Sequence, residues 1–361
     1  MKSCRRFAAA ITLAAMSVPW GPTFTRAACQ MIMPGDPGGK ANTIIFKGCN
    51  IEINNGSGST TTVNGLGNLT LGYNENRGGG ADRRTGSHNF IVGAKNNHTS
   101  YGGLVVGYQN ETNGSYSTVN GGSENVASGS YAAIAGGRVN RATGAYASVT
   151  GGQYGAAIGG SSMVLGGWNN QATANFATVA GGSDNVATSK TPADPYALAY
   201  STVVGGTKNT ASGDSSSVTG GYDNEASGYA STVSGGSVNA AGGLYCWIGG
   251  GSSNVATGSY DSVAGGQENS AYGGYSTVSG GASNAAGGLR SSVCAGFANV
   301  ASGDRSSVTG GHLNEASGNY SSVSGGSYND ASGETAVVSG GYNHSATGLN
   351  DWRAGGYFQD Q

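Results

Sequence analysis

The chain has 361 residues, of which 69 are glycine and only 10% are charged, and its formal net charge at pH 7 is −2. Such glycine enrichment is typical of collagen or of disordered chains. Collagen is excluded because glycine does not recur at every third residue and proline numbers only 6. Disorder is disfavoured because glycine, valine and alanine fall at fixed positions, and the absence of a basic stripe argues against nucleic-acid binding.

Residues 1–27 have the pattern of a secretory signal peptide. Lys2 and the pair Arg5 and Arg6 form a basic start, an apolar stretch follows, and small residues precede a cleavage point after Ala27. The apolar stretch is shorter than the ~20 residues that a membrane span needs. We therefore expect an exported chain, secreted or at the cell surface with the periplasm as an alternative, and no membrane span in the mature chain.

Residues 28–64 are expected to form a small N-terminal β cap. The apolar runs 43–46 and 50–53 are typical of short strands that cover the end of a repeat array. In an exported protein, Cys29 and Cys49 are candidates for a disulfide that clamps this cap. Two unpaired thiols are the alternative.

Residues 65–356 form the repeat domain, which is organised around a column of valines. When the valine of each repeat is taken as position zero, Val or Ile recurs every 15 residues, apart from one insertion at 190–198. The members of this column are Val119, Ile134, Val149, Val164, Val179, Val203, Val218, Val233, Ile248, Val263, Val278, Val293, Val308, Val323 and Val338.

Other columns keep the same phase. Positions +2 and +3 are Gly-Gly, except where Ala295 replaces the first glycine. Position +6 is Asn, except for Gly155 and His344, and position +8 is Ala in every one of these repeats. A 15-residue period is too short for a pair of helices and suits one turn of a parallel β-solenoid with glycine corners.

Strand alternation predicts which side chains fill each coil. Positions −2, 0, +2 and +8 are expected to point inward, positions −3, −1 and +1 outward, and the Asn column to form an internal amide ladder. Segments 90–93 and 104–107 are earlier coils, 14 residues apart. Residues 74–88 are expected to be an insertion, Arg353 marks a degenerate last coil, and 357–361 form a polar tail.

Position −3 is aromatic in most repeats. We consider two interpretations: a stripe for ligand binding or oligomer contact, for which tyrosine is well suited, or rings that stack along the same chain. The residues are Tyr116, Tyr131, Tyr146, Phe176, Tyr200, Tyr245, Tyr260, Tyr275 and Tyr320.

We expect no catalytic, cofactor or metal site. The four histidines are scattered and share no metal-ligand spacing with carboxylates. Asp223 and Glu225 are close in sequence, but they lack the partner that glycoside hydrolysis needs. Cys246 and Cys294 are three coils apart, which is too far for a disulfide.

The columns resemble the YadA-like head domain of trimeric autotransporter adhesins over roughly residues 65–356. The family repeat runs Ser-Val-Ala-Ile-Gly-x-x-Ser-x-Ala-x-Gly, and residues 322–333 match it position by position, with Gly in place of the family Ile and Asn in place of the family Ser. The resemblance implies a left-handed parallel β-roll, a homotrimer and binding to host or matrix surfaces. Because the sequence contains neither a heptad stalk nor C-terminal anchor strands, a complete autotransporter is not expected.

Three functions follow as hypotheses. The first is a non-enzymatic adhesin-like protein that binds extracellular matrix, a glycan or a cell-surface ligand through a repetitive β-wall. The second is an ice-binding solenoid, which would need regular threonine ranks, whereas the outward columns here mix Ser, Thr and Ala. The third is a polysaccharide-active β-solenoid enzyme, which would need paired carboxylates on adjacent coils.

Overall fold

The structure is a computed structural model that describes residues 30–32, 34, 36, 38–39, 43–189 and 199–355. The chain divides into two compact units, Met1–Glu52 and Ile53–Gln361. Every regular element in the described residues is a β-strand. This part of the chain therefore has no helix that is long and apolar enough to cross a membrane. Outside the described residues lie the predicted signal peptide at 1–27, the insertion at 190–198 and the tail at 357–361.

The first unit contains one strand pair. Strand β1 (Gln30–Ile32) runs antiparallel to β2 (Ile45–Lys47). The prediction of a strand at 50–53 is wrong: none of these residues belongs to a strand, and Ile51 stays 61% exposed. That the pair β1–β2 covers the end of the repeats stays a prediction.

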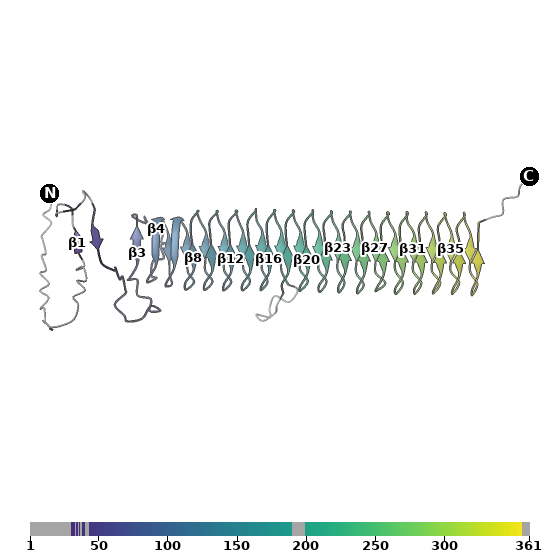
Figure 1. Ribbon diagram of the computed structural model, residues 1–361, viewed down its shortest axis with the longest axis horizontal. Helices are drawn as coiled ribbons and strands as arrows, with labels where there is room; N and C mark the ends of the chain where they lie inside the picture. The colour runs from purple at the N-terminus through teal and green to yellow at the C-terminus, as the bar shows by residue number, and fades with distance from the viewer. Residues whose placement is uncertain are drawn as a thin grey trace, which may run out of the picture. The chain divides into compact units, whose positions relative to one another are not determined.

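In the second unit, the coils contribute strands to two parallel sheets (Figure 1). The first sheet contains the position-zero column and is called the valine sheet. Its strands, in order, are β3 (Leu69–Leu71), β4 (Phe90–Ala94), β6 (Leu104–Tyr108), β8 (Thr118–Val119), β10 (Ala133–Ile134), β12 (Ser148–Val149), β14 (Met163–Val164), β16 (Thr178–Val179), β18 (Thr202–Val203), β20 (Ser217–Val218), β22 (Thr232–Val233), β24 (Trp247–Ile248), β26 (Ser262–Val263), β28 (Thr277–Val278), β30 (Ser292–Val293), β32 (Ser307–Val308), β34 (Ser322–Val323), β36 (Val337–Val338) and β38 (Trp352–Arg353).

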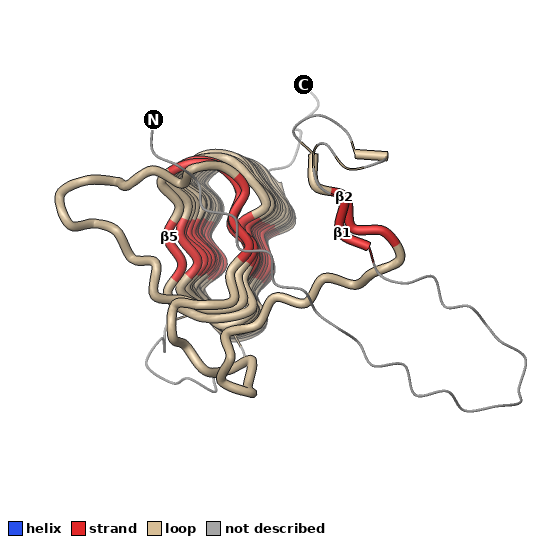
Figure 2. Tube along the Cα trace, turned by 90° about the vertical axis from the view of Figure 1, so that its left-hand side faces the viewer, coloured by secondary structure: helices blue, strands red, loops and turns tan. Residues whose placement is uncertain are grey.

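The second sheet contains the position +8 column and is called the alanine sheet. Viewed along the direction in which the coils stack, the strands of the two sheets form two facing rows (Figure 2). The alanine-sheet strands are β5 (Asn97–His98), β7 (Glu111–Thr112), β9 (Val126–Ala127), β11 (Arg141–Ala142), β13 (Ala156–Ala157), β15 (Gln171–Ala172), β17 (Val186–Ala187), β19 (Thr210–Ala211), β21 (Glu225–Ala226), β23 (Ala240–Ala241), β25 (Val255–Ala256), β27 (Ser270–Ala271), β29 (Ala285–Ala286), β31 (Val300–Ala301), β33 (Glu315–Ala316), β35 (Asp330–Ala331) and β37 (Ser345–Ala346).

In this register, equivalent positions of successive coils are direct strand partners. Val119 of β8 faces Ile134 of β10, and this parallel pairing repeats from coil to coil. The 190–198 insertion leaves the register intact, because Val179 faces Val203 across it. The predicted parallel β-solenoid, with about 17 turns of about 15 residues, is therefore confirmed. Arg353 faces Val338, so the last described coil has lost its core valine.

The interior is narrow, and in each of the fifteen regular coils it is apolar at two points. The side chains of the valine column and of the alanine column, such as Val233 and Ala241, are completely buried. The −2 column is buried as well, for example at Ser117 and Ala132. The predicted inward positions −2, 0 and +8 are therefore confirmed, and small residues at −2 let the two sheets approach each other.

The asparagine column forms the predicted internal ladder. The backbone N–H of Asn140 donates to Oδ1 of Asn125 at 2.9 Å. The side-chain Nδ2 of Asn125 donates to the carbonyl oxygens of Gly121 and Gly137, at 3.1 and 3.0 Å. Each amide thus satisfies backbone groups of its own coil and of the next coil, which would otherwise be buried without partners.

The prediction that position +2 points inward is wrong. A Cβ built on Gly136 (+2) would meet no atom within 4 Å, whereas one on Gly137 (+3) would lie 2.2 Å from the carbonyl oxygen of Gly152. The physical reason is that the valine-sheet strand ends at position zero, so strand alternation no longer holds at +2. Gly137 then turns the chain with a left-handed φ of 88°.

The predicted 74–88 insertion is fastened to the first coils by Arg77. Its Nε donates to the carbonyl oxygen of Lys95 at 2.7 Å, and its Nη2 donates to that of Gln109 at 2.7 Å. Its Nη1 forms an ion pair with Glu111 at 3.1 Å. Because both charged side chains are mostly buried, this ion pair holds the insertion against the early coils.

Candidate functional site

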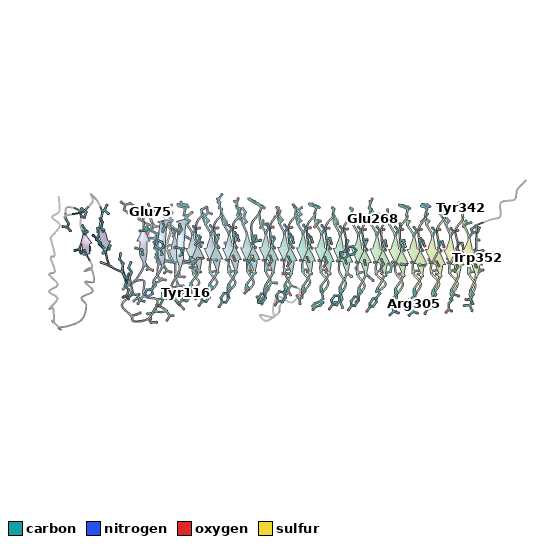
Figure 3. The ribbon with its side chains drawn as sticks, in the orientation of Figure 1. Glu75, Tyr116, Glu268, Arg305, Tyr342 and Trp352 are labelled. Carbon is teal, nitrogen blue, oxygen red and sulfur yellow. The ribbon has the colours of Figure 1, made fainter. Side chains whose placement is uncertain are left out.

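The predicted aromatic side chains lie along one corner of the coils. The aromatic edge is defined here as the nine side chains at position −3. All of them are exposed, from 39% at Tyr116 to 63% at Tyr146. Each has a left-handed φ, as in Tyr131 with φ 58°, which bends the chain two residues before the strand begins. Figure 3 shows Tyr116 on the same long edge of the second unit as Arg305.

The rings of the aromatic edge stack on one another from coil to coil. The ring centroids of Tyr131 and Tyr146 are 5.1 Å apart with an angle of 2° between the rings, and those of Tyr260 and Tyr275 are 4.8 Å apart at 9°. Stacking along the same chain, the second of our two interpretations, is therefore present. Neighbouring rings cover each other's faces, so the ring edges and hydroxyl ends face outward.

The aromatic edge is interrupted at Ser161, Ser215 and Ala230, and it changes character near its C-terminal end. There, Arg290 and Arg305 take the column position in two consecutive coils. The guanidinium carbon of Arg305 lies 5.1 Å from the ring centroid of Tyr320. Sequence reasoning missed these arginines because it counted aromatic residues only, although both stand in the same aligned column.

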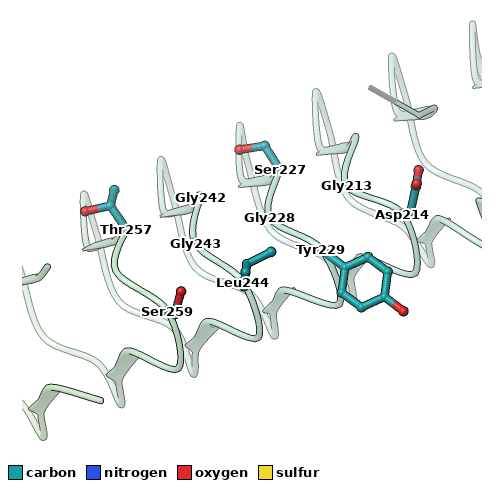
Figure 4. A pocket seen from close by; sticks show the side chains of 10 residues that line it. All are labelled: Gly213, Asp214, Ser227, Gly228, Tyr229, Gly242, Gly243, Leu244, Thr257 and Ser259. Atoms are coloured by element: carbon teal, nitrogen blue, oxygen red, sulfur yellow. The ribbon is translucent and has the colours of Figure 1, made fainter. Parts of the chain in front are cut away.

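A shallow groove runs beside the aromatic edge. Its volume is about 360 Å³, and its walls include Tyr229, Leu244 and Asp214, which lie one position before the aromatic column (Figure 4). The Tyr229 ring also meets the Tyr245 ring edge-on, with centroids 5.5 Å apart. Polar and apolar side chains therefore lie next to the stacked rings.

A second aromatic row occupies the opposite long edge. Tyr154 meets Trp168 with centroids 4.9 Å apart, and Tyr328 meets Tyr342 at 5.6 Å. Figure 3 shows Tyr342 and Glu268 together on this side. Sequence reasoning missed the row because its aromatic residues are divided between positions +4 and +5, so that neither column is aromatic throughout.

The carboxylates that we considered for glycan hydrolysis are exposed. Asp223 and Glu225 line a shallow depression of about 410 Å³ together with Lys208. Among the described residues, no three His, Cys, Asp or Glu side chains form a group that could hold a metal ion. The outward −1 column is interrupted by bulky residues, such as Met163 and Trp247, that break any regular threonine rank.

Two side chains in the interior of the coils have shifted pKa values. His98 of an early 14-residue coil aligns with the alanine column through Thr112 and Ala127, and burial, followed by the nearby charge of Arg84, lowers its pKa. Its Nδ1 has no hydrogen-bond partner. Burial also raises the pKa of the Cys246 thiol, which donates to the carbonyl oxygen of Gly258 at 2.8 Å.

The cysteines differ in their surroundings. Cys246 is buried and Cys294 is exposed, and both are free thiols. Cys29 lies outside the described residues, so its pairing with Cys49 stays a prediction.

No family model matches the chain, and no curated protein matches it either.

Proposed function

We propose that this chain is an exported, non-enzymatic, adhesin-like protein that presents its aromatic edge to extracellular matrix, a glycan or a cell-surface ligand. The proposal rests on the resemblance of the repeat to YadA-like heads and on the geometry of the edge. Export is part of the proposal, since the basic and apolar N-terminal pattern supports it.

The observation that carries the proposal is the regular stacking of the rings. Tyr245, Tyr260 and Tyr275 stand in successive coils with centroids 4.9 and 4.8 Å apart. Their neighbours already restrict the rings, so little side-chain entropy remains to be lost on binding. Tyrosine also offers an apolar ring together with a hydroxyl group that forms hydrogen bonds, a combination enriched at interfaces.

A repetitive surface suits ligands that are themselves extended. A long polymer or a matrix surface contacts several coils at once, and each additional contact is then intramolecular. Weak contacts at single tyrosines therefore combine into useful affinity, even though the groove beside the edge is shallow. A small ligand would gain little from such a surface, because concave sites bury most of a small ligand.

The test removes one block of stacked rings. Replacing Tyr245, Tyr260 and Tyr275 with serine is expected to weaken binding to immobilised collagen, fibronectin or the bound members of a glycan array by about tenfold or more. The fold is expected to persist, because serine occupies the same column at Ser161 and Ser215. Surface plasmon resonance measures the affinity, and circular dichroism checks the fold.

The matched control removes three tyrosines from the opposite edge: Tyr154, Tyr328 and Tyr342, each replaced with serine. Equal loss of binding in both variants, or full binding by the edge variant, contradicts the proposal. The resemblance also implies a homotrimer, and light scattering of the same variants tests it. If the edge variant becomes monomeric, the aromatic edge serves as a subunit seam rather than a ligand surface.

A further inference from the structure

Two arginines stand side by side in the aromatic column. Arg290 and Arg305 take position −3 in consecutive coils, where nine of fifteen coils have an aromatic residue. Their coils are bonded in register: the N–H of Arg305 donates to the carbonyl oxygen of Leu289 at 2.8 Å, and β30 pairs with β32. The backbones of the two arginines are therefore about one coil spacing apart, ~4.8 Å.

Aromatic rings flank the two arginines on both sides. The guanidinium of Arg290 lies over the ring of Tyr275, 5.9 Å from its centroid, and that of Arg305 lies over the ring of Tyr320 at 5.1 Å. Nη1 of Arg305 also donates a hydrogen bond to the hydroxyl of Tyr320. These contacts restrict the side chains and leave the remaining N–H groups of each planar fork free to face outward.

Among the described residues, no ion pair neutralises the charge of this arginine pair. The five ion pairs of the described residues involve neither Arg290 nor Arg305. Asp304 precedes Arg305, and Glu334 lies two coils further along, but neither carboxylate forms an ion pair with the two guanidiniums. Two like charges on adjacent coils repel each other, and an anion held between them would reduce that repulsion.

We infer that Arg290 and Arg305 together form a subsite for one sulfate or carboxylate group of an acidic polysaccharide. Guanidinium forks bind such groups through paired N–H···O hydrogen bonds. The inference rests on the proposed function, because it names the ligand class that the aromatic edge binds. It also accounts for two arginines where the column otherwise favours rings and small residues.

The geometry favours a polymer over a free anion. At an exposed site, water and salt screen a single anion, so a lone sulfate gains little. A polysaccharide that carries anionic groups along its length reaches the stacked rings of Tyr245, Tyr260 and Tyr275 in the preceding coils. Each of these contacts adds to the effective concentration at the arginine pair.

The experiment compares charged and neutral polymers. Isothermal titration calorimetry of the full chain uses heparin for sulfate, polygalacturonate for carboxylate and dextran as the neutral polymer. The R290Q/R305Q variant is expected to lose about tenfold or more of its affinity for heparin or polygalacturonate. R138Q/R141Q, which removes two charges elsewhere, is expected to keep it. R290K/R305K keeps the charge but loses the guanidinium forks. Its affinity is expected to lie between that of the unmodified chain and that of R290Q/R305Q.

Equal losses in R290Q/R305Q and R138Q/R141Q overturn the inference, because binding then depends on overall charge. Failure of the unmodified chain to bind either acidic polymer overturns it as well, and so does dextran binding of the same strength as heparin binding. The proposed function is judged separately by the collagen, fibronectin and glycan-array measurements, so each idea fails on its own result. Circular dichroism of every variant checks the fold, which glutamine should preserve because Asn350 occupies the same column.

Discussion

At the scale of residues, the asparagine column explains how such small coils satisfy their polar backbone. Nδ2 of Asn239 donates to the carbonyl oxygens of Gly235 and Gly251, at 2.9 and 3.1 Å. Its Oδ1 accepts the N–H of Asn254 at 3.0 Å. One side chain therefore bonds three backbone groups in two coils, and most of its hydrogen-bonding capacity is used.

Replacing Asn239 with alanine is expected to destabilise the array by about 2–4 kcal/mol, because several buried groups lose their partner at once. Urea unfolding measures the total effect. Hydrogen exchange of the Asn254 amide, which is expected to accelerate, locates it. The control is Ser237→Ala in the same coil, and an unchanged Asn254 amide would show that the ladder contributes little.

At the scale of elements, the two kinds of coil differ by one residue. Strand β6 has five residues and belongs to a 14-residue coil, whereas β8, one coil later, has two residues. Tyr108 pairs with Ser123 and Val105 with Val119, so the later coil contains one extra residue between these points. Gly107 lies against Gly122, and the asparagine side chains of the two coils bond the carbonyl oxygens of Val106 and Gly121 at equivalent points. The extra residue is therefore Asn120, at position +1, where the shortened strand has ended.

The two corner glycines are expected to differ sharply. Gly136→Ala should be neutral or stabilise the protein by up to about 1 kcal/mol, because its Cβ meets open space and alanine restricts the unfolded chain. Gly137→Ala should destabilise it by more than that, since its Cβ would lie 2.2 Å from a backbone oxygen at a left-handed φ. Ala295 already occupies the +2 position in one coil. Similar melting temperatures for both variants would contradict this assignment.

At the scale of the second unit, stability is shared between neighbouring coils. Each strand pairs with the coil before and the coil after, as β24 does with β22 and β26. The stack therefore behaves as a nearly one-dimensional array, in which loss of one coil removes one interface without disturbing the others.

Deletion of one whole 15-residue repeat tests whether the coils behave as such an array. Removal of residues 251–265 joins Gly250 to Gly266 in phase, so we expect a folded protein that is shorter by about one coil spacing, ~4.8 Å. Removal of residues 251–258 shifts the columns out of phase and should unfold the adjoining coils. Small-angle scattering and circular dichroism follow both variants, and equal folding of the two would contradict the columnar packing.

Much of this architecture was predictable from the sequence because every coil repeats the same packing problem. The 15-residue spacing of Val233 and Ile248 was enough to infer the coil, and the buried valine, alanine and asparagine columns followed from strand alternation. The corners were harder to predict. Alternation stops where a strand ends, which is why the direction of position +2 was predicted wrongly. The second aromatic row was missed because its residues are divided between positions +4 and +5.

The sequence by itself determined the period, the columns and their inward residues, because these depend on local spacing that is the same in every coil. Only the tertiary structure decided which corner side chains touch. Closure of each coil sets left-handed dihedrals at residues such as Tyr260, and coil stacking then places the rings of Tyr260 and Tyr275 4.8 Å apart. The same stacking brings Arg290 beside Arg305 although 15 residues separate them in the chain.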